Sequence, residues 1–219
     1  MNKIVIIPTF NEIENIEKII RKVFSLSEGF HILIVDDGSP DGTAEVVKKL
    51  QIEYPNELFL MERKGKQGLG TAYIAGFKWS IHKKYDYIFE MDADFSHNPD
   101  DLIKLYDSVQ KDGNDVSIGS RYIKSGKVEN WPLNRIFISY GASLYVRMIT
   151  FMPIKDCTAG FVCYKREVLE NIDLDKIRFI GYAFQIEMKY RAWRKGYKLK
   201  EVPINFVDRK EGHSKMTKG

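Results

Sequence analysis

Two aspartates one residue apart, Asp92 and Asp94, come directly after an apolar, aromatic-rich run that starts at Tyr85. A helix-starting sequence, Asn98-Pro99-Asp100, follows them. A strand that ends in two carboxylates places hard oxygen ligands where an α/β sheet keeps its ligand crevice. Such ligands suit Mg²⁺ or Mn²⁺, and these ions suit a diphosphate. The alternative interpretation is an acidic loop that only solvates the end of a strand.

A second acidic turn, Asp36-Asp37-Gly38, follows the apolar run at 31–35 and would share that sheet edge if the strands are parallel. It is not a calcium loop, because the twelfth position would be Lys48. The glycines Gly65-x-x-Gly68-x-Gly70 have the reverse of the Gly-x-Gly-x-x-Gly spacing that binds dinucleotides. The chain also has no P-loop motif. The pattern fits a nucleotide-diphosphate site, in which one carboxylate binds a base or ribose and the aspartate pair holds the diphosphate through a metal. The alternatives are a capped turn, and a phospho-receiver domain, which would not need the large second half of this chain.

Apolar runs of strand length alternate with amphipathic stretches of helix length from the first residue to about residue 119. We expect strands at 3–7, 31–35, 58–61, the run ending at Asp92, and 115–119, and helices opening near Asn11, Asp41, Thr71 and Pro99. Asn11 is expected to cap the first helix, with Glu14 three residues on and an apolar stripe that starts at Ile13. The pattern predicts an α/β fold, with a mostly parallel sheet flanked by helices on both faces.

The pattern changes beyond Arg121. We expect a polar loop to Trp131, a long amphipathic helix from about Pro132, an extended segment at 157–164, a helix at 183–195 and a strand at 199–207. We interpret the chain as one domain, 1–219, with a nucleotide-type first half, 1–120, and an acceptor-side second half, 121–219. The apolar side chains of the long helix indicate either ordinary core or a surface that lies on a membrane.

The composition fits a globular protein, since 44% of the 219 residues are hydrophobic and the net charge is only +4. This charge is too weak and dispersed to indicate nucleic acid, whereas anionic small molecules or a membrane surface are compatible with it. Two cysteines exclude a disulfide framework and favour a reducing compartment. No apolar run approaches the ~20 residues that span a bilayer, and the N-terminal run is too short for a signal peptide. We therefore expect a soluble or peripheral protein.

Several longer motifs follow one another along almost the whole chain. They are Pro8-Thr9-Phe10-Asn11-Glu12, Val35-Asp36-Asp37-Gly38-Ser39-Pro40-Asp41-Gly42-Thr43, Lys66-x-Gly68-Leu69-Gly70-x-Ala72-Tyr73, Met91-Asp92-Ala93-Asp94-Phe95-Ser96-His97-x-Pro99, Gly119-Ser120-Arg121-Tyr122, Phe184-Gln185-Ile186-Glu187-Met188 and Phe206-x-x-Arg209-x-x-Gly212-x-Ser214-Lys215. Through them the chain resembles glycosyltransferase family 2 enzymes of the GT-A fold, specifically the dolichyl-phosphate (polyprenyl-phosphate) mannose synthases. The first two motifs mark the wider family, and those around Asp92, Arg121 and Arg209 mark the subgroup.

The resemblance implies that residues 1–120 bind the nucleotide sugar GDP-mannose. The expected guanosine contacts are Pro8, Phe10, Glu12, Asp37, Lys66 and Gly68. Asp92 and Asp94 would hold Mg²⁺ or Mn²⁺ on the diphosphate. Gln185 and Glu187 would position sugar hydroxyls. Ser96 stands where some relatives have Gln, so a third metal contact is not carried over.

The resemblance also implies a polyprenyl (dolichyl) monophosphate as the acceptor. Arg121 would contact its phosphate, with Arg135 and Ser139 as helpers, and the forked donors of arginine suit such a group. Arg209 and Lys215 would close over the phosphates. The expected catalytic residues are Asp94, Arg121, Arg209 and Lys215.

The implied reaction transfers mannose from GDP-mannose to the lipid phosphate with inversion at the anomeric carbon. The attacking phosphate oxygen is ionised near neutral pH, so a strong general base is unnecessary. The protein would work peripherally at the cytoplasmic face of a membrane, with or without a membrane-anchoring partner subunit. One alternative is a family 2 transferase that uses UDP-glucose or another nucleotide sugar with the same acceptor. Another is a non-catalytic nucleotide-sugar-binding subunit.

Overall fold

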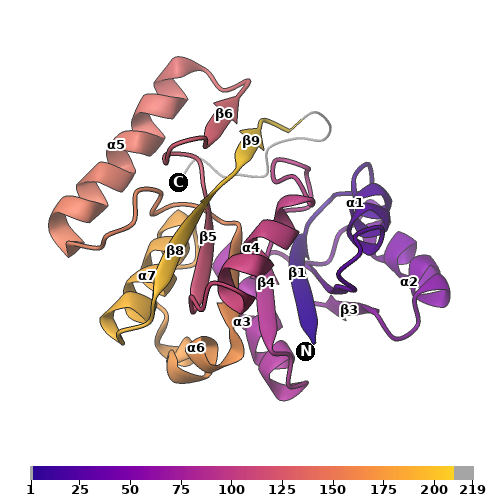
Figure 1. Cartoon of the computed structure of the whole chain (residues 1–219). Helices are drawn as coiled ribbons and strands as arrows, with labels where there is room; N and C mark the ends of the chain where they lie inside the picture. The colour runs from indigo at the N-terminus through magenta and orange to yellow at the C-terminus, as the bar shows by residue number, and fades with distance from the viewer. Residues whose placement is uncertain (1, 210–219) are drawn as a thin grey trace.

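A seven-stranded sheet organises residues 2–209, the part of the chain that the computed structural model describes (Figure 1). Its strands are β1 (Lys3–Thr9), β2 (His31–Asp36), β3 (Leu58–Glu62), β4 (Tyr87–Glu90), β5 (Val116–Ser120), β7 (Val162–Lys165) and β8 (Leu199–Pro203). Their order across the sheet is β3-β2-β1-β4-β7-β5-β8. β7 runs antiparallel to β4 and β5, and the other neighbours are parallel. The predicted mostly parallel sheet is therefore confirmed.

Helices cover both faces of this sheet, as expected. They are α1 (Ile16–Phe24), α2 (Thr43–Glu53), α3 (Leu69–His82), α4 (Asp101–Gln110), α6 (Arg166–Asn171) and α7 (Tyr182–Arg194). Successive strand residues point to opposite faces. Ile4 and Ile6 of β1 belong to the core that includes side chains of α3, α6 and α7, whereas Val5 and Ile7 belong to the core that includes side chains of α1, α2 and α4. Burial on both faces explains why the strands are apolar throughout.

A second, smaller sheet lies beside the main one. It consists of β6 (Lys127–Glu129) and β9 (Asn205–Val207), which run parallel. The strand expected over 199–207 is therefore two strands, and β6 forms in a segment expected to be a loop. Pro203 ends β8 because proline has no N–H to continue a ladder. The N–H of Val207 donates to the carbonyl of Ser96 (3.2 Å), so β9 lies against the loop that follows β4.

The prediction that Asn11 caps the first helix is wrong. α1 begins at Ile16, and Asn11 has a φ of 57°, in the left-handed region. Its N–H donates to Oγ of Ser39 (2.9 Å), and the N–H of Glu12 donates to Oγ1 of Thr43 (3.0 Å). Because the segment after β2 binds these N–H groups, the helix starts later than the sequence pattern indicates.

The long helix α5 (Leu133–Thr150) lies at the edge of the molecule (Figure 1), and of its side chains only Val146 packs against one of the two cores. Within α5 only Ser143 is buried. Phe137 is 73% exposed, Ile138 72% and Tyr145 62%. Ordinary core, one of the two interpretations of this helix, is therefore wrong.

The sheet joins residues from both sides of the boundary at 120/121, since β7 lies between β4 and β5. The extended segment expected at 157–164 becomes a strand only from Val162. A short helix, α6, and a 3₁₀ turn (Leu174–Lys176) follow it, and neither was expected. The assignment of residues 1–120 to the donor and 121–219 to the acceptor stays a prediction.

Candidate active site

A cavity of about 500 Å³ lies at the carboxyl ends of β1, β4 and β5. Parallel strands bring these ends to one edge of a sheet, where ligands of α/β proteins bind. The expected site residues that line it are Pro8, Phe10, Glu12, Asp37, Lys66, Gly68, Asp92, Asp94, Arg121, Arg135, Gln185 and Arg209. Ser139 and Glu187 are described by the structure but do not line this cavity. Lys215 lies outside the described residues.

The two carboxylates of the turn after β2 have different surroundings. Asp36 accepts hydrogen bonds from Oγ1 of Thr9 (2.9 Å) and from the N–H and hydroxyl of Ser39 (2.9 and 2.6 Å). Asp37 lines the cavity and forms an ion pair with Nε of Arg63 (2.7 Å). Burial raises the pKa of Asp37, and the charge of Arg63 limits the rise. The capped-turn interpretation thus describes Asp36, while Asp37 is the carboxylate that faces the cavity.

The wall beside this turn combines an aromatic ring, a cation and a glycine loop. Nζ of Lys66 lies 5.5 Å from the centroid of the Phe10 ring, within cation–π range. Gly68 has a φ of 98°, and a Cβ there would meet Ile180 at 3.4 Å, so glycine suits both the conformation and the close approach. Glu12 is only 6% exposed and contributes a second carboxylate. A few directed polar groups on a largely apolar wall are typical of a nucleotide-sized ligand site.

Asp92 and Asp94 lie together in the loop after β4. Burial raises the pKa of Asp92 to about 7, and the negative charge of Asp94 is the second cause. Oδ1 of Asp94 accepts hydrogen bonds from the N–H and hydroxyl of Ser96 (3.0 and 2.6 Å), and its Oδ2 forms an ion pair with Nη2 of Arg209 (2.8 Å). Because the carboxylates of Asp92 and Asp94 repel each other, a positive charge bound beside them would stabilise both.

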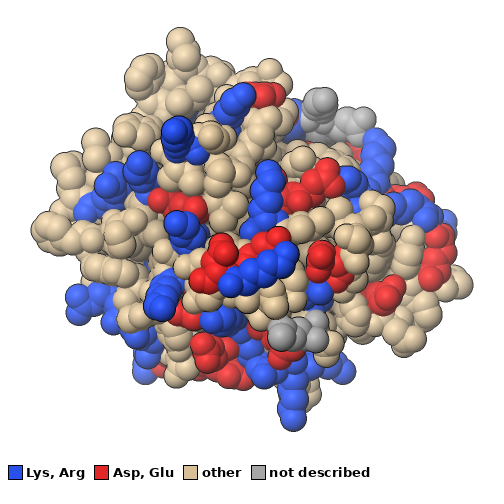
Figure 2. Space-filling model, viewed as in Figure 1, with Lys and Arg blue, Asp and Glu red and all other residues tan. Residues whose placement is uncertain are grey.

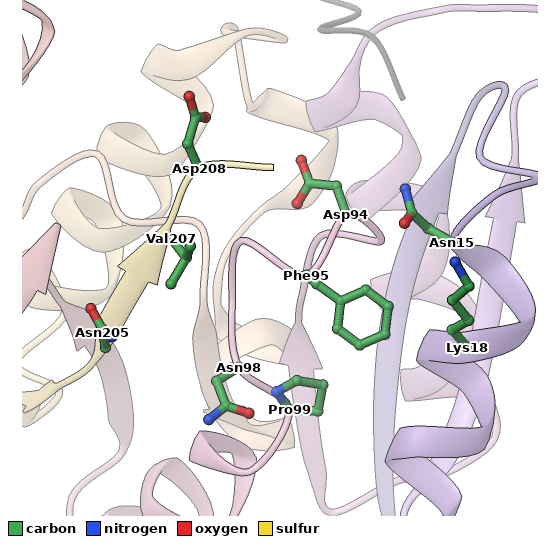
Figure 3. A pocket seen from close by; sticks show the side chains of 9 residues that line it. All are labelled: Asn15, Lys18, Asp94, Phe95, Asn98, Pro99, Asn205, Val207 and Asp208. Carbon is green, nitrogen blue, oxygen red and sulfur yellow. The ribbon is translucent and has the colours of Figure 1, made fainter. Parts of the chain in front are cut away.

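Asp94 also borders a second cavity, of about 390 Å³, on the side of α1 (Figure 3). Figure 3 shows Asp94 between Asn15 and Asp208, with the ring of Phe95 below it. Phe95 has a φ of 58°, a left-handed conformation in the tight turn that directs Asp94. The carboxylate of Asp94 therefore lies between two cavities.

The aspartate pair fits a hard divalent cation. Among residues 2–209, no group of three or more His, Cys, Asp or Glu side chains could hold a metal ion by itself. Mg²⁺ is usually bound by one or two carboxylates together with waters and substrate phosphates, and Mn²⁺ prefers the same oxygen ligands. Asp92 and Asp94 therefore suit such an ion when a diphosphate completes its coordination.

All three expected arginines line the cavity, and each has a carboxylate partner. The pairs are Arg121 with Asp156 (2.6 Å), Arg135 with Asp208 (3.2 Å) and Arg209 with Asp94 (2.8 Å). The guanidinium carbon of Arg135 lies 3.9 Å from the centroid of the Trp131 ring. Asp156 and Asp208 were not expected from the sequence, because neither belongs to an acidic cluster or an assigned motif position.

The floor of the cavity includes His97, which was part of a motif but had no assigned role. Its ring stacks on Phe161 with 4.9 Å between centroids and meets Phe206 edge-on at 5.3 Å. Burial lowers the pKa of His97 to about 4, so the imidazole is neutral near neutral pH. The position of His97 makes it an aromatic floor residue.

A buried polar network lies under Gln185, and the sequence did not indicate it. Nε2 of Gln185 donates to Oε2 of Glu90, while Nζ of Lys189 donates to Oε1 of Gln185 (3.2 Å) and to the carbonyl of Ala159 (2.6 Å). Burial raises the pKa of Glu90 to about 8 and lowers the pKa of Lys189 to about 8. The one feature of the sequence that could have indicated this network is Glu90, a carboxylate at the end of the apolar strand β4.

Glu187 and Ser139 have positions outside the cavity. Glu187 accepts hydrogen bonds from the N–H groups of Arg178 (2.9 Å) and Phe179 (3.1 Å) and pairs with Arg191 (2.7 Å). It thus holds the loop that precedes α7, and its location does not support the expected contact with a sugar hydroxyl. Ser139 lies on α5 near the hydroxyl of Tyr122.

Solved structures share this architecture over almost the whole chain. Glucosyl-3-phosphoglycerate synthase from Mycobacterium tuberculosis, in complex with Mn²⁺ and UDP, matches with a TM-score of 0.71 at 16% identity over 97% of this chain and 73% of that chain. Mannosyltransferase PcManGT from Pyrobaculum calidifontis, in complex with GDP-Man and Mn²⁺, matches with a TM-score of 0.66 at 18% identity over 97% of this chain and 58% of that chain. The fold is that of the GT-A glycosyltransferases.

The sequence model of glycosyl transferase family 2 matches residues 4–173, and the chain belongs to this family. Polyprenol monophosphomannose synthase from Mycolicibacterium smegmatis is 46% identical over 98% of this chain and 80% of its own length. Undecaprenyl-phosphate mannosyltransferase from Micrococcus luteus is 42% identical over 100% of this chain and 89% of its own length. Dolichol-phosphate mannosyltransferase from Pyrococcus furiosus is 39% identical over 97% of this chain and 58% of its own length.

Proposed function

We propose that this protein transfers mannose from GDP-mannose to a polyprenyl monophosphate, with inversion at the anomeric carbon. The supporting observation is that an aspartate pair and three arginines from separate segments meet at one cavity. The chain that builds this cavity is 39–46% identical to relatives named as polyprenol-, undecaprenyl- and dolichol-phosphate mannose transferases.

The donor nucleoside would occupy the wall formed by Pro8, Phe10 and Lys66. Asp37, held by Arg63 at 2.7 Å, would accept hydrogen bonds from the base or the ribose. Because the ion pair with Arg63 fixes this carboxylate before binding, less side-chain freedom is lost when the ligand arrives. Glu12 and Gly68 would complete this part of the site.

The diphosphate would lie at Asp92 and Asp94, the pair that fits Mg²⁺ or Mn²⁺. When bound, such an ion supplies positive charge that stabilises the diphosphate of the leaving GDP. The direction of Asp94 is set by its two hydrogen bonds from Ser96. Gln185, whose amide is oriented by Glu90 and Lys189, would position a sugar hydroxyl.

The acceptor phosphate must approach a donor that is already negative. Arg135 and Arg209 would compensate this charge, and these two arginines together with Arg121 would donate N–H hydrogen bonds to the phosphate oxygens. The partners of Arg135 and Arg209 are carboxylates in side-chain pairs that are partly exposed, so phosphate oxygens can replace them. Lys215 is proposed to join these arginines.

In the chemical step, an oxygen of the acceptor phosphate attacks the anomeric carbon of mannose. The bond between that carbon and the diphosphate oxygen breaks, and its electron pair leaves with GDP. The attacking oxygen carries no proton near neutral pH, so no general base is required. The neutral His97, with its pKa near 4, is consistent with a floor residue that takes no part in proton transfer.

The lipid acceptor calls for a membrane-facing surface, and α5 fits this role. The most exposed apolar side chains of α5 and the residue after it are Leu133, Phe137, Ile138, Tyr145, Met148, Ile149 and Phe151. The charged residues of α5 are two arginines, and it has no acidic residue. Figure 2 shows a largely uncharged surface over α5, and the charged side chains near it are mainly Lys and Arg. We propose that α5 lies on the cytoplasmic face of a membrane, with its cations toward anionic head groups.

None of the helices in residues 2–209 has the length and apolar character needed to cross a bilayer.

The test is transfer of radiolabelled sugar to a short polyprenyl phosphate from GDP-mannose, UDP-glucose and other nucleotide sugars, with Mg²⁺ and Mn²⁺ titrated. We expect transfer from GDP-mannose only, and only with a divalent ion. Asp94→Asn should abolish metal-dependent turnover, whereas Asp100→Asn, at a surface carboxylate that pairs with Lys22, should not. Arg121→Ala should raise the KM for the lipid.

Other outcomes would change the assignment. If only UDP-glucose supported transfer, the donor would be UDP-glucose in place of GDP-mannose. If no nucleotide sugar supported transfer in the presence of lipid vesicles, a non-catalytic subunit would be favoured. Full activity of both Asp94→Asn and Arg121→Ala would refute the site.

A further inference from the structure

Asp156 binds Arg121 through several hydrogen bonds, and the sequence did not predict this contact. Nε and Nη2 of Arg121 donate to the two oxygens of Asp156 at 2.7 and 2.6 Å, and the backbone N–H of Arg121 donates to Oδ2 at 3.0 Å. Nη2 also donates to Oγ1 of Thr158 at 2.9 Å. The Asp156 side chain is 0% exposed and that of Arg121 8%. This is a buried, forked ion pair of the kind that fixes direction as well as charge.

Asp156 is itself held from the main sheet. Its N–H donates to Oε1 of Glu201 (2.9 Å), and the N–H of Lys155 donates to Oε2 of the same carboxylate (2.9 Å). The hydroxyl of Ser120, the last residue of β5, donates to Oε1 of Glu201 (2.7 Å). Glu201 lies on β8, which pairs with β5. The loop that carries Asp156 is therefore tied to the two strands whose ends frame Arg121.

Aromatic rings surround the same guanidinium. Its carbon lies 5.1 Å from the ring centroid of Tyr122, 5.5 Å from that of Trp131 and 5.4 Å from that of Phe206. Arg121 lines the cavity along with Trp131 and Phe206. Rings and carboxylate together leave the side chain little rotamer freedom.

The other two arginines of the cavity are held more loosely. Arg135 is 45% exposed and its partner Asp208 is 33% exposed, while Arg209 is 27% exposed and its partner Asp94, which a bound cation would compensate, is 8% exposed. A partly exposed pair can exchange its carboxylate for a phosphate at low cost, because solvent screens the separated charges. The Arg121–Asp156 pair cannot, because separation would leave a buried charge without compensation.

We propose that Asp156 is a positioning residue for the lipid phosphate, acting through Arg121; this inference rests on the proposed function of Arg121. Because Asp156 neutralises Arg121, this arginine contributes fixed N–H directions and little net charge. Net compensation of the acceptor phosphate then comes from Arg135 and Arg209. Removal of Asp156 should impair use of the acceptor and leave donor binding intact.

The experiment compares Asp156→Asn and Arg121→Ala, singly and combined, with two readouts: the KM for a short polyprenyl phosphate and the Kd for GDP-mannose by calorimetry. Each single variant should raise the acceptor KM about ten- to hundredfold, because one charge-assisted hydrogen bond at a buried site is lost or misdirected. The donor Kd should change less than about twofold. In the Arg121→Ala background, Asp156→Asn should have no further effect on KM.

Asp115→Asn is the matched control. Asp115 also accepts a backbone N–H, from Lys198 (2.9 Å), and pairs with Lys165 (2.8 Å), and it precedes β5 at the end of the strand opposite Arg121. This variant should lower the melting temperature and leave the acceptor KM unchanged. If Asp156→Asn does not fold, Thr158→Val removes one hydrogen bond to Arg121 without burying a charge and should raise the acceptor KM severalfold.

The outcomes separate the two proposals. If Arg121→Ala leaves the acceptor KM unchanged, the proposed role of Arg121 is wrong and this inference is overturned along with it. If Arg121→Ala raises KM but Asp156→Asn and Thr158→Val do not, only the positioning role of Asp156 is overturned. Parallel losses of donor and acceptor binding in Asp156→Asn would show a purely structural residue.

Discussion

Arg209 forms an ion pair with Asp94, a proposed metal ligand. Replacing Arg209 should therefore strengthen metal binding and weaken turnover. Nη2 of Arg209 lies 2.8 Å from Oδ2 of Asp94, with the two side chains 27% and 8% exposed. The charge of Arg209 also acts against the rise in the pKa of Asp92 that burial and Asp94 cause. Arg209 thus partly compensates the aspartate pair, as a divalent ion would. A cation that binds there must displace it.

The size of the effect follows from the geometry of this pair. A hydrogen bond between charged groups contributes about 1.5–3 kcal/mol, and partial exposure of the guanidinium reduces this to about 1–2 kcal/mol. Since about 1.4 kcal/mol corresponds to a factor of ten, Arg209→Gln should bind Mn²⁺ about five- to thirtyfold more tightly without nucleotide. Turnover should fall, because Arg209 is proposed to contact the substrate phosphates.

Free Mn²⁺ measured by electron paramagnetic resonance during a titration of the nucleotide-free protein gives the Kd directly. Arg135→Gln is the control. It also removes one positive charge from the cavity wall, but the carboxylate partner of Arg135 is Asp208 and not Asp94. An unchanged Kd in Arg209→Gln would refute the reasoning. An equal gain in Arg135→Gln would show a general charge effect, unrelated to the contact with Asp94.

Three further measurements test individual polar groups. Lys189→Met should lower the free energy of unfolding in urea by about 1–3 kcal/mol, because the buried carbonyl of Ala159 and the side-chain oxygen of Gln185 lose their donor; an unchanged free energy of unfolding would refute this role. Both thiols of the folded protein should resist a thiol reagent at about pH 8 and react in denaturant. The reason is that burial raises the pKa of Cys157 to about 11 and that of Cys163 well above its usual value. Rapid labelling of the native protein would contradict this prediction. Burial lowers the pKa of His31 in the folded protein, so the stability this residue contributes is present above its unfolded pKa of about 6.5 and is lost as the pH falls through its folded value. His31→Gln should therefore flatten the fall in unfolding free energy as the pH decreases below about 6.5.

Local patterns predicted most of the sheet. The apolar runs at 3–7, 31–35 and 58–61 are strands within two residues of their expected ends, because burial on both faces leaves a continuous apolar signal. The parallel arrangement then brought the turn after β2 and the aspartate pair after β4 to one edge. Asn11 shows where local reasoning failed. Its N–H is bound by Ser39, 28 residues away, and a capping pattern carries no information about such a partner.

The partners of the site residues lay beyond the reach of the sequence. Asp156 is 35 residues from Arg121, and Glu90 is 95 residues from Gln185. Such contacts depend on how strands are ordered across the sheet, and β7 enters between β4 and β5 in an order that chain succession does not specify. The same holds for α5, because an apolar helix is core or surface according to what packs against it.

The amino-acid sequence alone determined the strand and helix periodicity, the acidic turns at strand ends and the family motifs, because these depend on neighbours within a few residues. Only the tertiary structure decided that Asp37 faces the cavity while Asp36 caps its turn. It also decided which carboxylate holds each arginine and that α5 is left uncovered. The physical reason is that charge pairing and burial depend on distances between segments far apart in the chain.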